Sequence, residues 1–116
     1  MFTLELKPLF WWPVTCEIPS AEKIGEFDLH TFEMQFELLG RDESRAVLEE
    51  KGSEDGNDEL MKRVSKGWRN VVDGQGQPIA FSEATFAAAW QQSWFRIAVN
   101  RAYTGALIGD KARLGN

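Results

Sequence analysis

Residues 27–38 read FDLHTFEMQFEL, and this stretch decides the fold because it predicts one long strand. Apolar and polar residues alternate along it, as in a strand with one buried face. The apolar residues are odd-numbered before His30 and even-numbered after Thr31, so the alternation changes phase between them. Two interpretations follow: a β-bulge restores one buried face, or the strand leaves one layer of the fold and joins another.

Two shorter strands are expected before this stretch. Phe2–Leu6 and Val14–Ile18 both alternate apolar with polar residues. Pro8 and Pro13 bracket the four residues between these strands, and a proline lacks the N–H that a central strand needs. That connecting segment is therefore a loop or a sheet edge. Residues 1–40 are expected to form an antiparallel β-meander of about three strands.

Two short helices with a polar loop between them are expected over residues 41–67. Asp42 is placed to cap the first helix and Asp58 the second. The stretch Gly52–Asn57 is polar and contains glycine, which indicates a mobile loop. Gly67 suits the left-handed conformation near the end of the second helix. Apolar residues of that helix recur at helical spacing, and they are Leu60, Met61, Val64 and Trp68.

A turn followed by helices is expected over residues 68–116. Asp73-Gly74 and Gly76-Gln77-Pro78 are strong turn signals. Ser82 can cap a helix, and a break near Gln92-Ser93 separates that helix from a last one. A thin stripe of small and apolar residues on the last helix allows a neighbouring element to approach closely. Its members are Phe95, Ala98, Val99, Ala102 and Ala106.

The whole pattern predicts one α+β domain, in which a sheet precedes a mostly helical C-terminal half. A chain of 116 residues leaves little room for a second domain. We expect residues 1–40 to form the sheet, residues 41–67 the helical pair, and residues 68–116 the turn and the C-terminal helices. The edge strand Phe2–Leu6 and the thin helix stripe are candidate contacts in a homo-oligomer.

Charge is distributed unevenly along the chain. The 13 Lys and Arg residues against 18 Asp and Glu residues give a formal net charge of −5. Residues 1–60 hold 5 basic and 15 acidic residues (−10), whereas residues 61–116 hold 8 and 3 (+5). A net-acidic chain lacks the basic footprint that nucleic-acid binding needs. Opposite charges on the two halves would instead attract copies head to tail or steer a charged partner, and salt would weaken such an assembly.

Segments for membranes or secretion are not evident in the sequence. No apolar run approaches the roughly 20 residues of a membrane span. The first residues do not combine a basic segment with an apolar stretch, so a secretory signal is not expected. A single cysteine cannot form an internal disulfide. We therefore expect a soluble protein of a reducing compartment that makes no membrane contact.

Catalytic and metal-binding chemistry finds little support. Cys16 and His30 supply the only thiol and imidazole, and a Cys–His nucleophile needs them adjacent, with a third group orienting the base. Cys16 is in phase with the apolar Val14 and Ile18, which favours a buried structural residue. His30, at the phase change, suits a bulge or a sheet edge. Without ligand spacing these two residues make no metal site. We expect neither an enzyme nor a cofactor.

Tryptophan is more frequent than a core of this size requires, with five in the chain. Trp11 and Trp12 are consecutive, so in an extended segment they point to opposite faces and at least one is exposed. Trp90 and Trp94 lie one helical turn apart, beside Phe95. Aromatic side chains exposed together dominate protein interfaces. Two interpretations follow: the helical tryptophans Trp90 and Trp94 belong to the core, or the aromatic residues form a surface that binds a partner protein.

A run of distinctive steps begins at Lys66. It has a Gly-Trp step, a hydrophobic pair, an Asp/Gly turn, a proline leading into a capped helix, and a final helix with an Ala-Tyr step. These residues are Gly67, Trp68, Val71, Val72, Asp73, Gly76, Pro78, Ile79, Phe81, Ser82, Phe86, Ala102 and Tyr103. The run resembles the tail assembly chaperones of long-tailed, siphophage-type bacteriophages. Many members have a proline between the last two helices, where this chain has Gln91-Gln92-Ser93.

The resemblance implies a non-enzymatic assembly factor in the host cytoplasm, encoded by a phage or prophage. Proteins of that family coat the long tape measure protein, keep it soluble before the tail tube polymerises around it, and are absent from the finished virion. The tape measure protein, and with it the tail tube protein, are the partners that this implies. The alternative is a small phage structural or adaptor protein, such as a tail completion or head–tail joining subunit, that stays in the virion. The residues expected to contact the partner are Trp11, Trp12, Trp94, Phe95 and Tyr103.

Overall fold

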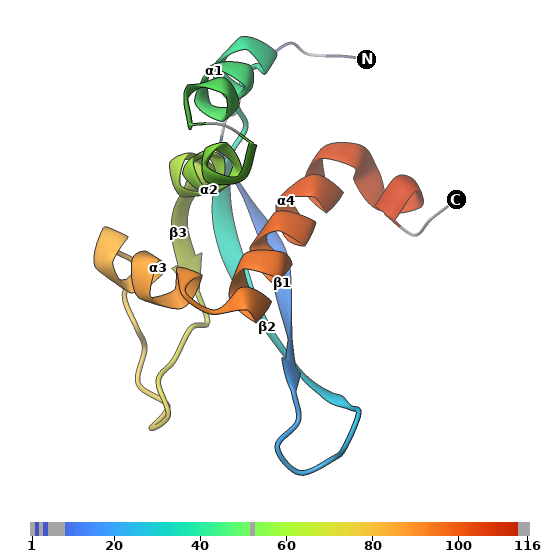
Figure 1. Cartoon of the computed structure of the whole chain (residues 1–116), viewed down its shortest axis with the longest axis vertical. Coiled ribbons are helices and arrows are strands. Elements are labelled where there is room, and N and C mark those ends of the chain that lie inside the picture. Colours follow the sequence, from blue (N-terminus) through green and yellow to red (C-terminus); the bar gives the residue numbers. More distant parts are fainter. Residues whose placement is uncertain (1, 3, 5–8, 52, 114–116) are drawn as a thin grey trace.

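A computed structural model describes residues 2, 4, 9–51 and 53–113 of the chain. These residues form a three-stranded antiparallel sheet with helices packed on its inner face (Figure 1), so the α+β class predicted from the sequence is confirmed. The elements in chain order are β1 (Leu9–Pro19), β2 (Phe27–Glu37), α1 (Arg41–Lys51), α2 (Ser53–Val64), β3 (Ser65–Arg69), α3 (Glu83–Trp90) and α4 (Ser93–Arg113).

The third strand of the sheet comes from a different place than expected. The sheet order is β1-β2-β3, and β3 follows the two short helices in the chain. The expected strand Phe2–Leu6 lies largely outside the described residues. β1 is longer than predicted because it continues through Pro13. Pro13 is tolerated because β1 lies at the edge of the sheet, where the N–H that proline lacks is not needed to bond a second neighbouring strand.

The phase change in β2 produces neither a bulge against β1 nor a change of layer. β1 and β2 pair in one uninterrupted register, from Leu9 opposite Glu37 to Pro19 opposite Phe27. Phe27 and Leu29 consequently lie on the outer face of the sheet, 57% and 65% exposed. The distal half of the β1–β2 hairpin extends beyond the helices (Figure 1), so helix packing does not force these residues onto the inner face. A register shift does occur, but between β2 and β3 at Gln35 and Phe36.

The core lies between the inner face of the sheet and the helices. Val14, Met34 and Phe36 are fully buried on this face. α4 crosses the face, and its Phe95 stacks on Phe32 with ring centroids 5.7 Å apart and nearly parallel planes. The other buried hydrophobic residues are Cys16, Leu60, Met61, Val64, Phe86, Trp90, Ala98, Val99, Ala102 and Tyr103. The core therefore draws on the sheet, α2, α3 and α4.

The stripe of small residues on α4 faces the sheet, as its spacing predicts for a close approach. Ala98 and Ala102 are 3% and 8% exposed. Small side chains let a helix backbone come near its neighbour, and here that neighbour is β1 of the same chain. Because packing within the chain covers the stripe, it leaves little surface for a second copy.

The segment expected as a mobile loop is helical over the part that the structure describes. α2 begins at Ser53, so Asp58 lies inside the helix and does not cap it, and Gly52 lies outside the described residues. α1 likewise begins at Arg41, which puts Asp42 in its first turn. The two helices pack so closely that a Cβ at Gly56 would stand 2.4 Å from the Leu48 carbonyl oxygen. Tertiary packing thus overrides the loop-like composition.

Trp68 and Gly67 lie on β3 and not at the end of a helix. α2 ends at Val64, and the left-handed conformation expected at Gly67 occurs instead at Asn70, with φ of 66°. Trp68 lies opposite Met34 on the inner face of the sheet, and its indole N–H donates a 2.7 Å hydrogen bond to the carbonyl oxygen of Ile79. Spacing alone did not separate helix from strand here, because the chain changes from one to the other immediately before β3.

The predicted turn and helix cap are both confirmed. The Asp73 side chain accepts hydrogen bonds from the backbone N–H groups of Gln75 and Gln77, and Gly76 has a positive φ of 79°. Val72 and Pro78 form an isolated antiparallel bridge, which closes the turn. Ser82 and Thr85 make a reciprocal capping box at the start of α3. The expected break near Gln92-Ser93 is present between α3 and α4.

Candidate functional site

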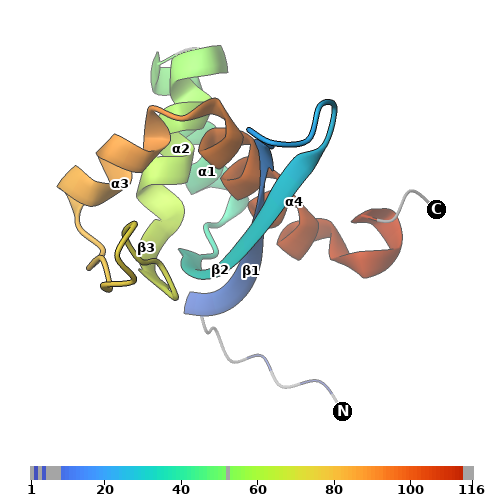
Figure 2. The same ribbon diagram turned by 90° about the horizontal axis from the view of Figure 1, so that it is seen from below.

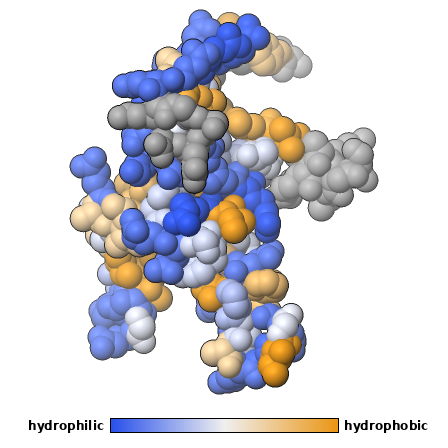
Figure 3. Space-filling model, viewed as in Figure 1, coloured by the Kyte–Doolittle hydropathy of each residue, from blue (hydrophilic) through white to orange (hydrophobic). Residues whose placement is uncertain are grey.

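Two projections leave the same side of the molecule. The hairpin arm is the distal part of the β1–β2 hairpin, residues 18–30, and the turn arm is the segment 70–79 between β3 and α3 (Figure 1). The space-filling view shows them as two separate extensions with a gap between them (Figure 3), and from below their tips lie well apart (Figure 2). The gap between the two arms is therefore open to a binding partner.

A cleft of about 360 Å³ lies between the bases of the arms. Its volume falls near the lower end of the roughly 300–1,000 Å³ typical of binding pockets. The hairpin contributes Cys16, Ile18, His30, Thr31 and Phe32. The segment from β3 into the turn arm contributes Trp68, Asn70, Val71 and Val72, and the two C-terminal helices contribute Ala89, Trp94 and Phe95. Most of these side chains are apolar, so the cleft is suited to apolar groups.

Trp94 forms one wall of the cleft and also reaches a second hollow. It is partly buried near the start of α4 and packs edge to face on Phe95, with ring centroids 6.4 Å apart. The second hollow, of about 310 Å³, lies between β1 and α4 and is lined by Phe27, Ile97 and Arg101 among others. Of the residues predicted to contact a partner, Trp94 therefore has the surroundings that fit the role best.

The other predicted contact residues lie elsewhere. Trp11 is on the outer face of the sheet, 38% exposed, with the Arg69 guanidinium 4.2 Å from its ring centre. Trp12 is on the inner face and partly buried. The two thus point to opposite faces, as predicted. Phe95 and Tyr103 are both 5% exposed. Their burial in the core leaves Phe95 only the floor of the cleft and gives Tyr103 no contact surface on the folded chain.

Several cleft residues were not among the predicted contacts. Ile18 belongs to the expected strand and Ala89 to the expected helix, so nothing local marked them as surface. Val71 and Val72 carried the clearest signal, since two β-branched residues directly precede a turn. Val72 is 54% exposed, so it offers apolar surface at the mouth of the cleft.

Cys16 and His30 are cross-strand neighbours in the cleft, directly opposite each other in the β1–β2 register. Cys16 is buried and His30 is exposed. Burial raises the pKa of the Cys16 thiol to about 11, so the thiol stays protonated near neutral pH. A nucleophilic cysteine needs a lowered pKa. Cys16 and His30 therefore both help to line the cleft, but the pair does not supply an activated nucleophile.

We expect the Cys16 thiol to react slowly with alkylating reagents while the protein is folded. A pKa of about 11 in place of 9.0 lowers the thiolate fraction at pH 8 by about 100-fold, before any shielding by burial. Labelling followed by mass spectrometry in increasing urea measures this. The rate should rise at the unfolding transition. Rapid labelling of the folded chain at pH 8 would contradict the burial and would revive a role for Cys16 as a nucleophile.

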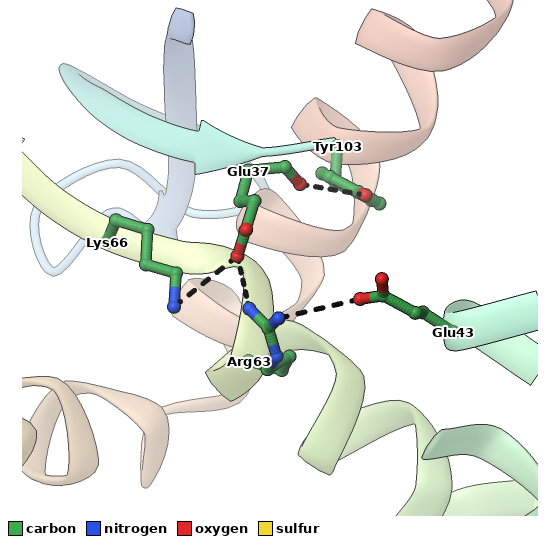
Figure 4. Close-up of polar contacts among 5 residues, drawn as sticks. All are labelled: Glu37, Glu43, Arg63, Lys66 and Tyr103. Atoms are coloured by element: carbon green, nitrogen blue, oxygen red, sulfur yellow. Dashed lines mark hydrogen bonds and ion pairs between the residues drawn. The ribbon is translucent and has the colours of Figure 1, made fainter. Parts of the chain in front are cut away.

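An ion-pair network holds the opposite end of the sheet (Figure 4). Glu37 at the end of β2 accepts a hydrogen bond from Arg63 and lies 3.5 Å from the Lys66 ammonium group, and Arg63 also reaches Glu43 at 3.6 Å. The Tyr103 hydroxyl donates to the Glu37 carbonyl oxygen at 3.2 Å. The hydrogen bond from Arg63 lowers the pKa of Glu37, so this pairing stabilises the fold above the ordinary carboxyl pKa and is lost as the pH falls below it. The Tyr103 ring is buried against Phe36, with ring centroids 5.2 Å apart, and its hydroxyl is satisfied by the Glu37 carbonyl oxygen.

Among the described residues, His, Cys, Asp and Glu side chains do not gather in groups of three that could hold a metal ion. None of the described helices has the length and apolar character needed to cross a membrane. A scan against protein-family models finds no match for the chain, and searches of the curated proteins and of the solved structures find none either.

Proposed function

We propose that this chain is a non-enzymatic phage tail assembly chaperone that binds an apolar segment of the tape measure protein in the cleft between its two arms. The resemblance from Lys66 onward supports the proposal, because the matching residues build one side of the cleft. Trp68, Val71 and Val72 are part of the resemblance and also line the cleft. The protein would act in the host cytoplasm before the tail tube assembles.

The observation that carries the proposal is the open, apolar cleft. A chaperone of this kind must cover hydrophobic surface of a partner that would otherwise aggregate. Burial of apolar area contributes about 25 cal/mol per Å². Aromatic residues in a well-packed pocket give most of the binding energy of many interfaces, and Trp68, Trp94 and Phe95 are such residues here.

Co-expression with the tape measure protein of the same genome tests the proposal. We expect the tape measure protein to stay soluble and to co-purify with this chain. Equal solubility with and without the chain would contradict the proposal. Mass spectrometry of purified particles separates the alternative: abundant peptides of this chain in the virion would favour a structural or adaptor subunit.

The variant Val72→Gln tests whether the cleft is the binding surface. It removes an exposed apolar side chain at the cleft without adding charge. We expect the concentration of chain that keeps half of the tape measure protein soluble to rise about tenfold, which corresponds to about 1.4 kcal/mol of lost apolar contact. The variant Leu107→Gln is the matched control, because Leu107 is 55% exposed on α4 and does not line the cleft. The same tenfold change in both variants would mean that the cleft is not the site.

A further inference from the structure

The charges on the two arms beside the cleft are almost all of one sign. The arms carry four carboxylates, and all four side chains are exposed. Glu22 and Glu26 lie at the tip of the hairpin arm, and Asp73 begins the turn of the turn arm. Asp28 lies opposite Ile18 in the register, on the same face as the cleft residue His30. Lys23 is the one basic residue of the two arms.

Basic side chains near the cleft are occupied elsewhere. None of the residues that line it is Lys or Arg. Arg69 lies on the outer face of the sheet, where it pairs with Glu33 at 2.9 Å. Arg101 pairs with Glu17 at 3.1 Å. Arg96 donates a 2.5 Å hydrogen bond to the Trp90 carbonyl oxygen. The cleft therefore has an apolar lining, and the two arms that extend from it form a negatively charged rim of four carboxylates against one lysine.

We infer that the segment bound in the cleft carries Lys or Arg residues beside its apolar side chains. The inference rests on the proposed function and specifies the chemistry of the partner. Apolar side chains would enter between Ile18, Val72 and Trp94, and the basic side chains would lie against the carboxylates of the arms. An acidic segment of equal hydrophobicity would be repelled by the same rim.

The preference for a basic segment depends on salt, because it comes from attraction between exposed charges. Complementary charge raises association rates and suppresses partners of the wrong sign. Screening shortens the range of these interactions from about 10 Å at 0.1 M salt to about 3 Å at 1 M. The apolar contribution, in contrast, is retained at high salt. Affinity at low salt therefore measures the electrostatic and the apolar contributions together, whereas affinity at high salt measures mainly the apolar contribution.

Two labelled synthetic peptides test the inference on the full chain. Both are amphipathic with the same Leu and Phe positions, and one carries Lys where the other carries Glu. We expect fluorescence anisotropy to show at least tenfold tighter binding of the Lys peptide at 50 mM salt, and a difference that shrinks to about twofold at 500 mM. Equal binding of the two peptides at 50 mM would overturn the inference and leave the proposed function standing. Binding of neither would also overturn it, and the co-expression result decides the proposed function separately.

A matched pair of double variants locates the effect. Glu26→Gln with Asp28→Asn removes two carboxylates from the hairpin arm, and Glu49→Gln with Glu50→Gln removes two exposed ones from α1. We expect the arm variant to lower the preference for the Lys peptide about threefold or more, and the α1 variant to leave it within a factor of two of the parent chain. Equal loss in both variants would show that overall net charge, and not the rim of the cleft, selects the peptide.

Discussion

Replacing Trp68 with alanine is expected to lower the free energy of unfolding by about 3–5 kcal/mol, the usual effect of removing a large aromatic side chain from a core. Trp68 makes edge contacts with Phe32, Phe81 and Phe95, with ring centroids 6.3, 5.2 and 6.3 Å away. Its indole N–H also holds the Ile79 carbonyl oxygen, which ties β3 to the segment leading into α3. Urea unfolding followed by circular dichroism measures the loss.

Trp11→Ala is the matched control, because it deletes the same side chain from the outer face of the sheet. Trp11 is 38% exposed and makes a cation–π contact with the Arg69 guanidinium. We expect a loss of about 1 kcal/mol or less, the range of an exposed cation–π contact. Trp68→Phe should fall between the two, since it keeps a ring but leaves the Ile79 carbonyl without its partner. Similar losses in the two alanine variants would contradict the position of Trp68 at the centre of the aromatic cluster.

Replacing Gly56 with alanine is expected to lower the free energy of unfolding by about 2 kcal/mol, within the range of overpacked cores. The new Cβ would stand 2.4 Å from the Leu48 carbonyl oxygen. Since this oxygen belongs to the backbone of α1, no side-chain rotation relieves the clash, and the two helices must move apart. The separation outweighs the gain of about 1 kcal/mol that alanine brings inside a helix.

Gly40→Ala is the control for this substitution. Gly40 precedes α1, and a Cβ there meets no atom within 4 Å. We expect its free energy of unfolding to stay within about 0.5 kcal/mol of the parent chain. If Gly56→Ala proves neutral or stabilising in the same urea titration, α1 and α2 do not pack as described.

The pattern of β2 shows how far periodicity predicts this sheet. The alternation from Phe32 to Phe36 correctly identifies the buried face, since helices cover that part of the strand. Phe27 and Leu29 stay more than half exposed, Phe27 at the margin of the hollow beside α4, so apolar residues there do not mark a buried face. Periodicity predicts which face is buried only where something covers it.

The helical pair and β3 needed information from distant residues. The composition of 53–57 is typical of a loop, and the segment is helical because it packs on α1. Trp68 fits the spacing of the helix before it, yet it belongs to a strand because β2 offers its edge there. The turn at Asp73 and the cap at Ser82 depend on neighbours only a few residues away, and these were predicted correctly.

The cleft could be predicted only in part for the same reason. Trp94 was predicted as a partner contact because it lies beside Phe95 among the clustered aromatic residues, and it does line the cleft. The residues around it come from β1, β2, β3, the turn arm, α3 and α4. Residues so far apart in the chain come together only through the way α3 and α4 pack on the sheet, which no local pattern contains. Phe95 belongs to the stripe expected to face a neighbouring element and Tyr103 follows the stripe residue Ala102, so both are buried where α4 packs on the sheet.

Amide hydrogen exchange on the complex co-purified with the tape measure protein tests the central claim most directly. The account predicts slower exchange than in the free chain in three segments that line the cleft, residues 28–32, 70–73 and 89–95. It predicts unchanged exchange in α1 and on the outer face of the sheet around Trp11. Protection that is confined to α1 or to Trp11 and its neighbours, with the three cleft segments unchanged, would contradict the account.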